Sequence, residues 1–254
     1  MLAAGAQVAA NIVAADWGLR QVVVNTTPAP PTPSYAWKFY LVDKFPPAAP
    51  QRAYGYHTVE GDTVVAYINV PLCSSIFGTI TDFPQVGTPK DSFYTPQKQI
   101  LFPGSVSEVL THELAEALVD PQVNRYADDG TDAPGNMWMI EVGDHADSWR
   151  YVVTGSVTTT TGTIIKRRTT RTQRMIAQDH TTPAFYDSYN TTGPYSHTGN
   201  APGPFKIDVK NTTCYAWRRS ATGAPITQGY DRLGGETPNQ TATPSATPPS
   251  PKNT

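Results

Sequence analysis

The chain has 254 residues, which is enough to bury the core of one sizeable domain. Its 19 Lys and Arg nearly balance its 21 Asp and Glu, and the net charge of −2 gives no global field that would attract nucleic acid or an anionic membrane. Neither a phosphate-binding glycine-rich loop nor a Gly-x-Ser-x-Gly nucleophile elbow occurs, which argues against the main nucleotide-binding and serine-hydrolase classes.

The N-terminal residues 1–15 are apolar but have no positively charged start, and Gln7 and Asn11 interrupt them. A short helix is therefore favoured over a signal peptide, and no segment is long and apolar enough to cross a membrane. Residues 20–25 are rich in β-branched side chains and predict a strand. The proline-rich run at 26–34 cannot be helical and predicts a connector.

The next part of the chain changes from β to helical patterning. The runs AWKFYLV at 36–42 and TVVAYINV at 63–70 predict two buried or half-buried strands. Apolar residues then recur at helical spacing, which predicts a helix from about Ser107 to about Val119. Ser105 or Ser107 can cap its start, and Asp120 is expected to end it because a proline follows.

Beyond the helix, the run MWMIEV at 137–142 predicts an apolar strand, and two threonine-rich strands at 151–160 and 162–176 predict a hairpin. Residues 183–204 lack periodicity and predict ordered loop. The sequence thus predicts an α+β fold with a mixed or antiparallel sheet and one active-site helix. Three parts are expected: an N-terminal segment with its connector over 1–34, a metal-binding domain over 35–235, and a disordered Pro/Thr-rich tail over 236–254.

The predicted helix carries the residues that point to chemistry. Because positions four apart share a helix face, His112 and Glu116 can hold one metal ion together. Glu113 then lies beside the ion, where the related H-E-x-x-H helices place a carboxylate that takes a proton from water. The alternative is an ordinary helix face on which His112 and Glu116 merely form a stabilising pair.

A catalytic zinc site commonly needs a third protein ligand and an open position. Glu141 stands alone within the apolar run, and burying its charge costs several kcal/mol unless a partner or metal compensates. It is the first choice for the third ligand, Asp144 is the second, and Asp120 is a further alternative. A carboxylate of this set that does not bind the metal can instead accept a hydrogen bond from His112 and orient its ring.

A site with one histidine and two carboxylates prefers harder ions than a two-histidine site does. Zinc is the expected metal, with calcium or manganese also admissible. His57, after a strand-like segment, is a candidate ligand or transition-state donor, although a histidine beside tyrosines is often only packed. Tyr186, Tyr195 and His197 in the late loop are further candidates for stabilising an oxyanion.

The passage from His112 to residue 147 resembles a zincin-like family known from actinobacteria and their tailed phages. The likeness covers about residues 54–206. It departs at Gly143, where a cysteine is frequent, and at the Lys166–Arg174 hairpin, which is longer and more basic than usual. The segments that carry it are Gly55-Tyr56-His57, the His112–Glu116 helix ending in Val119-Asp120-Pro121, Asn124-Arg125-Tyr126, Glu141-Val142-Gly143-Asp144, Thr182-Pro183-Ala184-Phe185-Tyr186-Asp187 and Pro204-Phe205.

This resemblance implies a zincin-like fold and zinc-dependent hydrolysis of a peptide or protein substrate, with Glu113 as the general base and His57 assisting. Its phage members suggest an alternative, a virion or tail-associated structural protein that keeps the metal without catalysis and contacts other virion proteins. An extracellular or virion-associated location is favoured in either case. The 13 Tyr and five Trp leave a carbohydrate-binding module as a third idea. Cys73 and Cys214 are either a disulfide or two buried thiols.

Overall fold

The computed structural model of the protein describes these residues: 1–25, 36–47, 53–77, 104–130, 136–146, 149–161, 167–206, 216–219 and 225–229. The connector predicted at 26–34, the tail predicted at 236–254 and the possible disulfide partner Cys214 lie outside them. No helix within the described ranges has the length and apolarity needed to span a membrane.

Two α-helices, nine strands and three short 3-10 helices make up the described fold. The helices are α1 (Leu2–Asp16), α2 (Val106–Val119), η1 (Val70–Leu72), η3 (Asp144–Ala146) and η4 (Pro183–Tyr186). The strands are β1 (Lys38–Val42), β2 (Gly55–Glu60), β3 (Thr63–Asn69), β4 (Tyr126–Asp128), β5 (Asn136–Met139), β6 (Arg150–Thr161), β7 (Arg167–Gln178), β8 (Ala216–Arg219) and β9 (Pro225–Gly229). The predicted α+β class is confirmed.

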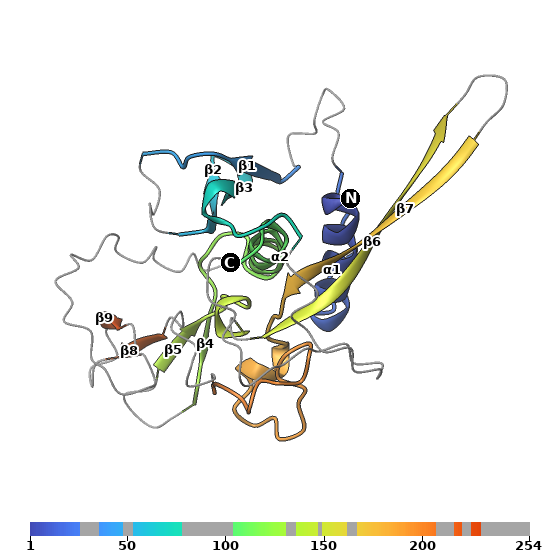
Figure 1. The fold of residues 1–254 in the computed structure, drawn as a ribbon. Helices are drawn as coiled ribbons and strands as arrows, with labels where there is room; N and C mark the ends of the chain where they lie inside the picture. The colour runs from blue at the N-terminus through green and yellow to red at the C-terminus, as the bar shows by residue number, and fades with distance from the viewer. Residues whose placement is uncertain are drawn as a thin grey trace.

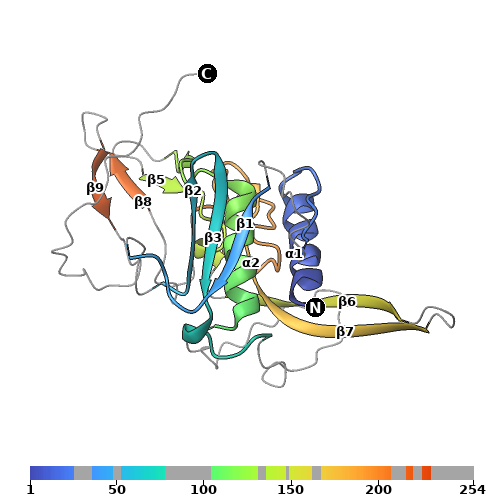
Figure 2. The ribbon, with the colours of Figure 1, turned by 90° about the horizontal axis from the view of Figure 1, so that it is seen from above.

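Helix α2 lies at the centre of the molecule, between the three-stranded sheet of β1, β2 and β3 and helix α1 (Figures 1 and 2). The sheet has the order β1-β3-β2, with β1 parallel and β2 antiparallel to β3, so it is mixed. Side chains from all three layers meet in one core, which includes Val13 of α1, Ile68 of β3 and Leu114 of α2. Such a helix is buried on every side, unlike an amphipathic surface helix.

The start and end of α2 follow from local side-chain chemistry. Of the two predicted caps, Ser105 and Ser107, the structure has Ser105 as the N-cap, and it forms a capping box with Glu108. Glu108 also accepts a 2.6 Å hydrogen bond from Arg150 of β6, and this buried ion pair fixes the helix start to the hairpin. Asp120 is the C-cap. Of the 14 residues of α2, only His112 is not buried, so the helix exposes a single functional side chain.

Helix α1 confirms the short N-terminal helix and shares the core of α2. Its Ala6, Ala10 and Val13 pack in that core, while its other face meets the β6–β7 hairpin. The strand predicted at 20–25 is wrong, because that segment is not a strand and pairs with none of the described strands. The Gln7 side chain, which donates to Val22 O and accepts from Val24 N, satisfies its backbone instead.

Two of the remaining predicted strands are present as expected, and a third is shorter than its sequence pattern predicts. The strands predicted at 36–42 and 63–70 are confirmed as β1 and β3, and Gly61, with φ +61°, makes the turn from β2 into β3. The strand predicted at 137–142 stops at Met139, since the chain turns at Glu141 and His145 N bonds back to Glu141 O. Strand β5 belongs to a second, four-stranded sheet of order β4-β5-β8-β9.

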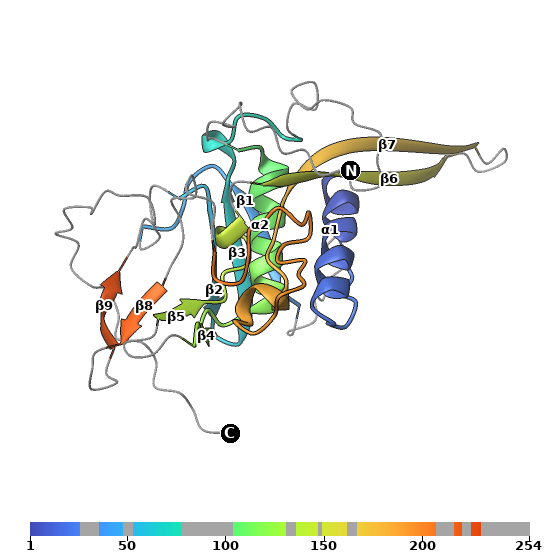
Figure 3. The same ribbon diagram turned by 90° about the horizontal axis from the view of Figure 1, so that it is seen from below.

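The threonine-rich hairpin is confirmed as β6 and β7, with its tip at 162–166 outside the described residues. It crosses α1 and then projects from the body of the protein (Figures 1 and 2). The chain after β7 continues as loops and the short helix η4, which lie against the C-terminal end of α1 (Figure 3). The ordered loop predicted at 183–204 is confirmed apart from η4.

Candidate metal centre

Helix α2 and two other segments bring acidic and imidazole side chains together in one cluster. The helix supplies His112, Glu113 and Glu116, strand β2 supplies His57, and the turn after β5 supplies Asp144. Strand β2 can approach the helix this closely because it begins with a glycine. A Cβ on Gly55 would lie 2.6 Å from Glu113 Oε1 and 2.6 Å from Val109 Cγ1.

The first group, which we call the rim triad, consists of His112, Glu116 and Asp144. His112 Nε2 lies 3.2 Å from Glu116 Oε1 and 3.3 Å from Asp144 Oδ1. Two ligands of a tetrahedral zinc ion, each about 2.1 Å from it, lie about 3.4 Å apart. A charge-assisted hydrogen bond between the same atoms is shorter, typically about 2.7–2.9 Å. The two separations from His112 Nε2 are thus compatible with ligands of one metal ion as well as with long hydrogen bonds.

The second group, the inner triad, consists of His57, Glu113 and Glu116. His57 Nδ1 lies 3.4 Å from Glu113 Oε2 and 3.6 Å from Glu116 Oε2, while His57 Nε2 lies 3.2 Å from Asp120 O. In each triad the possible ligand atoms lie within 4.8 Å of one another, and Glu116 belongs to both. Glu116 is thus the residue that joins the two triads.

The cluster carries more acid than base in a buried place. Glu113, Glu116 and Glu141 are each at most 6% exposed, and with Asp144 they lie beside two imidazoles in the described part of the chain. When every group is ionised, these four carboxylates outnumber the two imidazolium charges, and in the described part of the chain Glu113 and Glu116 make their ion pairs with these histidines alone. Uncompensated buried charge is costly, and a divalent cation would neutralise it.

The imidazole pKa values reflect this excess of negative charge. Burial lowers the pKa of His57, but hydrogen bonds to Glu113 and Glu116 outweigh it and raise that pKa to about 11. Burial likewise opposes protonation of His112, yet the carboxylates of Glu116 and Asp144 raise its pKa well above the ordinary value. In the metal-free protein, protons on these rings supply positive charge that a metal ion would displace.

The two helix carboxylates are driven in opposite directions. Burial raises the pKa of Glu113, and the two histidines only partly offset this. Glu116 experiences the same burial, but His112 and His57 together hold its pKa well below the usual range. Paired carboxyls with separated pKa values are typical of sites where one group moves a proton and the other stays ionised.

Glu141 and Asp120 lie close to the cluster but outside both triads. Burial, and then the charge of Glu116, raises the pKa of Glu141 well above its usual value, so this carboxyl is a neighbour of the centre. The Asp120 carboxylate accepts backbone hydrogen bonds from Asn124 and Arg125 at 3.2 Å and 2.7 Å, which gives it a structural role at the helix end. Asp144, the second choice for a third ligand, is the one placed beside His112.

The Gly143→Ala variant is expected to weaken metal binding while the protein stays folded. A Cβ at this position would lie 2.6 Å from His112 Nδ1, so the ring or the turn that carries Asp144 must move. Displacing a ligand by such amounts typically costs about 10- to 100-fold in metal affinity, measurable by zinc titration. Gly104→Ala is the control, because its nearest atom is 3.4 Å away, an ordinary contact. Equal affinities in the two variants would contradict the rim triad.

The late-loop candidates are engaged elsewhere. Tyr195 OH donates to Asn190 O, and Tyr186 OH lies 2.8 Å from His145 Nδ1. His197 bonds to Asp16 of α1, in a group that also contains His180. The sequence indicated neither Asp16 nor His180, because no local motif joins residues 164 positions apart.

The cluster on α2 stands on its geometry alone. No protein-family model, curated protein or solved structure matches the chain. The fold is α+β, with small mixed and antiparallel sheets and a buried histidine–glutamate group that could bind a metal.

Proposed function

We propose that the protein is a zinc-dependent, zincin-like peptidase with its active site at the cluster on α2. One observation carries this proposal: α2 presents His112, Glu113 and Glu116 in a buried group with excess negative charge. A helix that only packs has no use for the two buried carboxyl groups of Glu113 and Glu116, since each costs free energy to bury. A dication would stabilise both of them.

In this proposal the rim triad holds the metal. Its spacing fits tetrahedral zinc, and its His112 and Asp144 side chains are 18% and 15% exposed, so water and substrate can approach from that side. The inner triad is less suitable because its members are almost completely buried, leaving little room for an open position. The zinc ion would supply Lewis-acid activation of water and of the scissile carbonyl.

Glu113 would accept the proton from the attacking water and later give it to the leaving amine. Its raised pKa moves this carboxyl towards the range in which a group can both take up and release a proton near neutral pH. His57 would hold the Glu113 carboxylate in place, since its Nε2 is anchored on Asp120 O while Nδ1 faces Glu113. Peptide as the substrate rests on the likeness of this helix to the peptidase H-E-x-x-H helix.

The direct test is cleavage of a mixed peptide library by the purified protein. We expect cleavage that a zinc chelator abolishes and that added Zn²⁺ restores. Cleavage that survives chelation, or no cleavage by zinc-loaded protein, would overturn the proposal. Parallel reconstitution with Mn²⁺ and Ca²⁺ tests the metal, because the carboxylate-rich triad also suits harder ions.

A second candidate is a structural protein, such as a virion component, in which the metal only stabilises the fold. The burial of Glu113, which is 4% exposed and paired with His57, favours it. The two candidates differ in what Glu113 does. Replacing it therefore separates them.

A further inference from the structure

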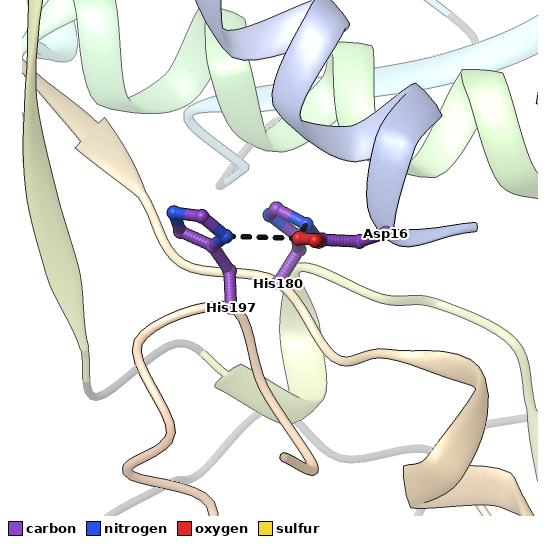
Figure 4. Close-up of side chains that lie close together, drawn as sticks. All are labelled: Asp16, His180 and His197. Carbon is purple, nitrogen blue, oxygen red and sulfur yellow. Dashed lines mark hydrogen bonds and ion pairs between the residues drawn. The ribbon is translucent and has the colours of Figure 1, made fainter. Parts of the chain in front are cut away.

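A second group of possible metal ligands lies at the C-terminal end of α1. His180 Nε2 and His197 Nδ1 each lie 2.9 Å from the same atom, Asp16 Oδ2 (Figure 4). The two imidazole rings are stacked, with centroids 5.4 Å apart and planes 11° from parallel. Three segments distant in the chain thus converge on one point.

Asp16 occupies an unfavourable place for a carboxylate. It is the last residue of α1, where the helix dipole presents its negative end. A carboxylate there is stabilised only by nearby positive charge. The neighbouring Trp17 donates from Nε1 to Thr181 O, so the same loop is already attached to the helix end.

A second carboxylate, Asp179, increases the local need for positive charge. It is fully buried, and its partners include the His180 and Thr198 backbone N–H groups and the Thr198 hydroxyl, which are neutral donors. A cation bound at Asp16 would also favour the ionised form of this neighbouring carboxyl. Buried carboxylates of this kind normally require a cation or metal.

His180 is the most enclosed of the three groups. Its side chain is completely buried, and its Nε2 is directed at Asp16 Oδ2. The neutral imidazole ring is the form that binds a metal.

We propose that Asp16, His180 and His197 bind a divalent transition metal of the zinc class, which ties the end of α1 to the loops after β7. Two imidazoles and one carboxylate are a ligand set that such ions accept and that calcium or magnesium does not favour. Separations of 2.9 Å are shorter than the roughly 3.4 Å between tetrahedral ligands. They suit ligands at right angles about 2.1 Å from an ion, as in octahedral sites with two histidines, one carboxylate and open positions. The Asp16 and His197 side chains are 26% and 31% exposed, so the ion has access and water can complete its coordination.

The same 2.9 Å contacts also suit plain hydrogen bonds, and two isosteric replacements distinguish the two roles. In His180→Gln the amide nitrogen replaces Nε2, and in His197→Asn it replaces Nδ1. Both amides can still donate to Asp16, but neither is a ligand for zinc-class ions. A purely hydrogen-bonded clamp would therefore tolerate both changes.

The test is a calorimetric titration of metal-free protein, without a histidine tag, with Zn²⁺. We expect two zinc ions per wild-type chain. His180→Gln and His197→Asn should each bind one zinc ion, or bind the second at least about 100-fold more weakly. Adding Glu116→Gln to either variant should remove the zinc ion that remains. If the α2 site itself binds no metal, wild type should bind one zinc ion and the two variants none. The zinc count therefore distinguishes a failure of the proposed function from a failure of the Asp16 site.

Zinc binding by His180→Gln and His197→Asn equal to that of wild type would overturn the second site. If either variant does not fold, the Glu116→Gln variant provides the test, because it keeps this site intact. Its zinc-loaded form should show two imidazole ligands in the X-ray absorption spectrum. Absence of bound zinc, or zinc without imidazole ligands, would also contradict the proposal.

Discussion

The Glu113→Gln variant is expected to lose about 10²- to 10⁴-fold of kcat while still holding its metal, as expected when a general base is removed. The amide keeps the size of the side chain but cannot accept the proton, and the rim triad of His112, Glu116 and Asp144 is untouched. KM should change little, because Glu113 would act on the attacking water. Steady-state kinetics with a cleaved peptide, together with zinc content, provide the measurement.

Glu60→Gln is a suitable control, since Glu60 is an exposed residue at the end of β2, and its activity should match that of wild type. If kcat of Glu113→Gln falls less than tenfold while zinc is retained, Glu113 is not the general base. The structural interpretation of the metal would then be preferred.

The Glu116→Gln variant is expected to lose metal from the α2 site, with affinity falling by more than about 100-fold. Glu116 is common to the rim and inner triads, and its ionised carboxylate faces both His112 and His57. An amide removes the charge that these imidazoles and a metal share. Zinc titration in a background that lacks the Asp16 site, such as His197→Asn, isolates the effect.

Two further variants identify the third ligand in the same assay. Asp144→Asn should weaken zinc binding about as much as Glu116→Gln, because Asp144 lies 3.3 Å from His112 Nε2. Glu141→Gln should have a smaller effect, since Glu141 influences the centre only as a buried neighbour. The reverse order would make Glu141 the ligand.

The helix at the centre of the site was predictable because several local signals agree there. The apolar spacing, a serine cap at Ser105 or Ser107 and the Asp120-Pro121 stop indicate a helix from about Ser107 to Val119, and α2 begins one residue earlier and ends at Val119. The pairing of His112 with Glu116 follows directly from helix geometry. The hairpin of β6 and β7 was predictable for a similar reason, since its turn and its two β-branched strands are adjacent in the chain.

Features that depend on distant partners were not predictable. Residues 20–25 have strand propensity, but the Gln7 side chain takes the backbone groups that a neighbouring strand would have used. The strand predicted at 137–142 ends early because the turn through Glu141 and Asp144 faces α2. Strand propensity depends on a residue and its neighbours in the sequence. Whether these two segments form strands depends on contacts with residues that are distant in the sequence.

The Asp16 group shows the same limit for sites. Its members come from the end of one helix and from two loops, with no shared spacing that a motif could capture. The only local signal is a carboxylate at the C-terminal end of a helix, an unfavourable position that needs compensation. That signal alone does not say which residues compensate.

The most direct test of the α2 metal centre is anomalous X-ray diffraction at the zinc edge from crystals of zinc-loaded protein. We predict an anomalous peak about 2.0–2.2 Å from His112 Nε2, Glu116 and Asp144. Zinc-loaded crystals with no anomalous peak at these three side chains would contradict the metal centre and, with it, the proposed peptidase.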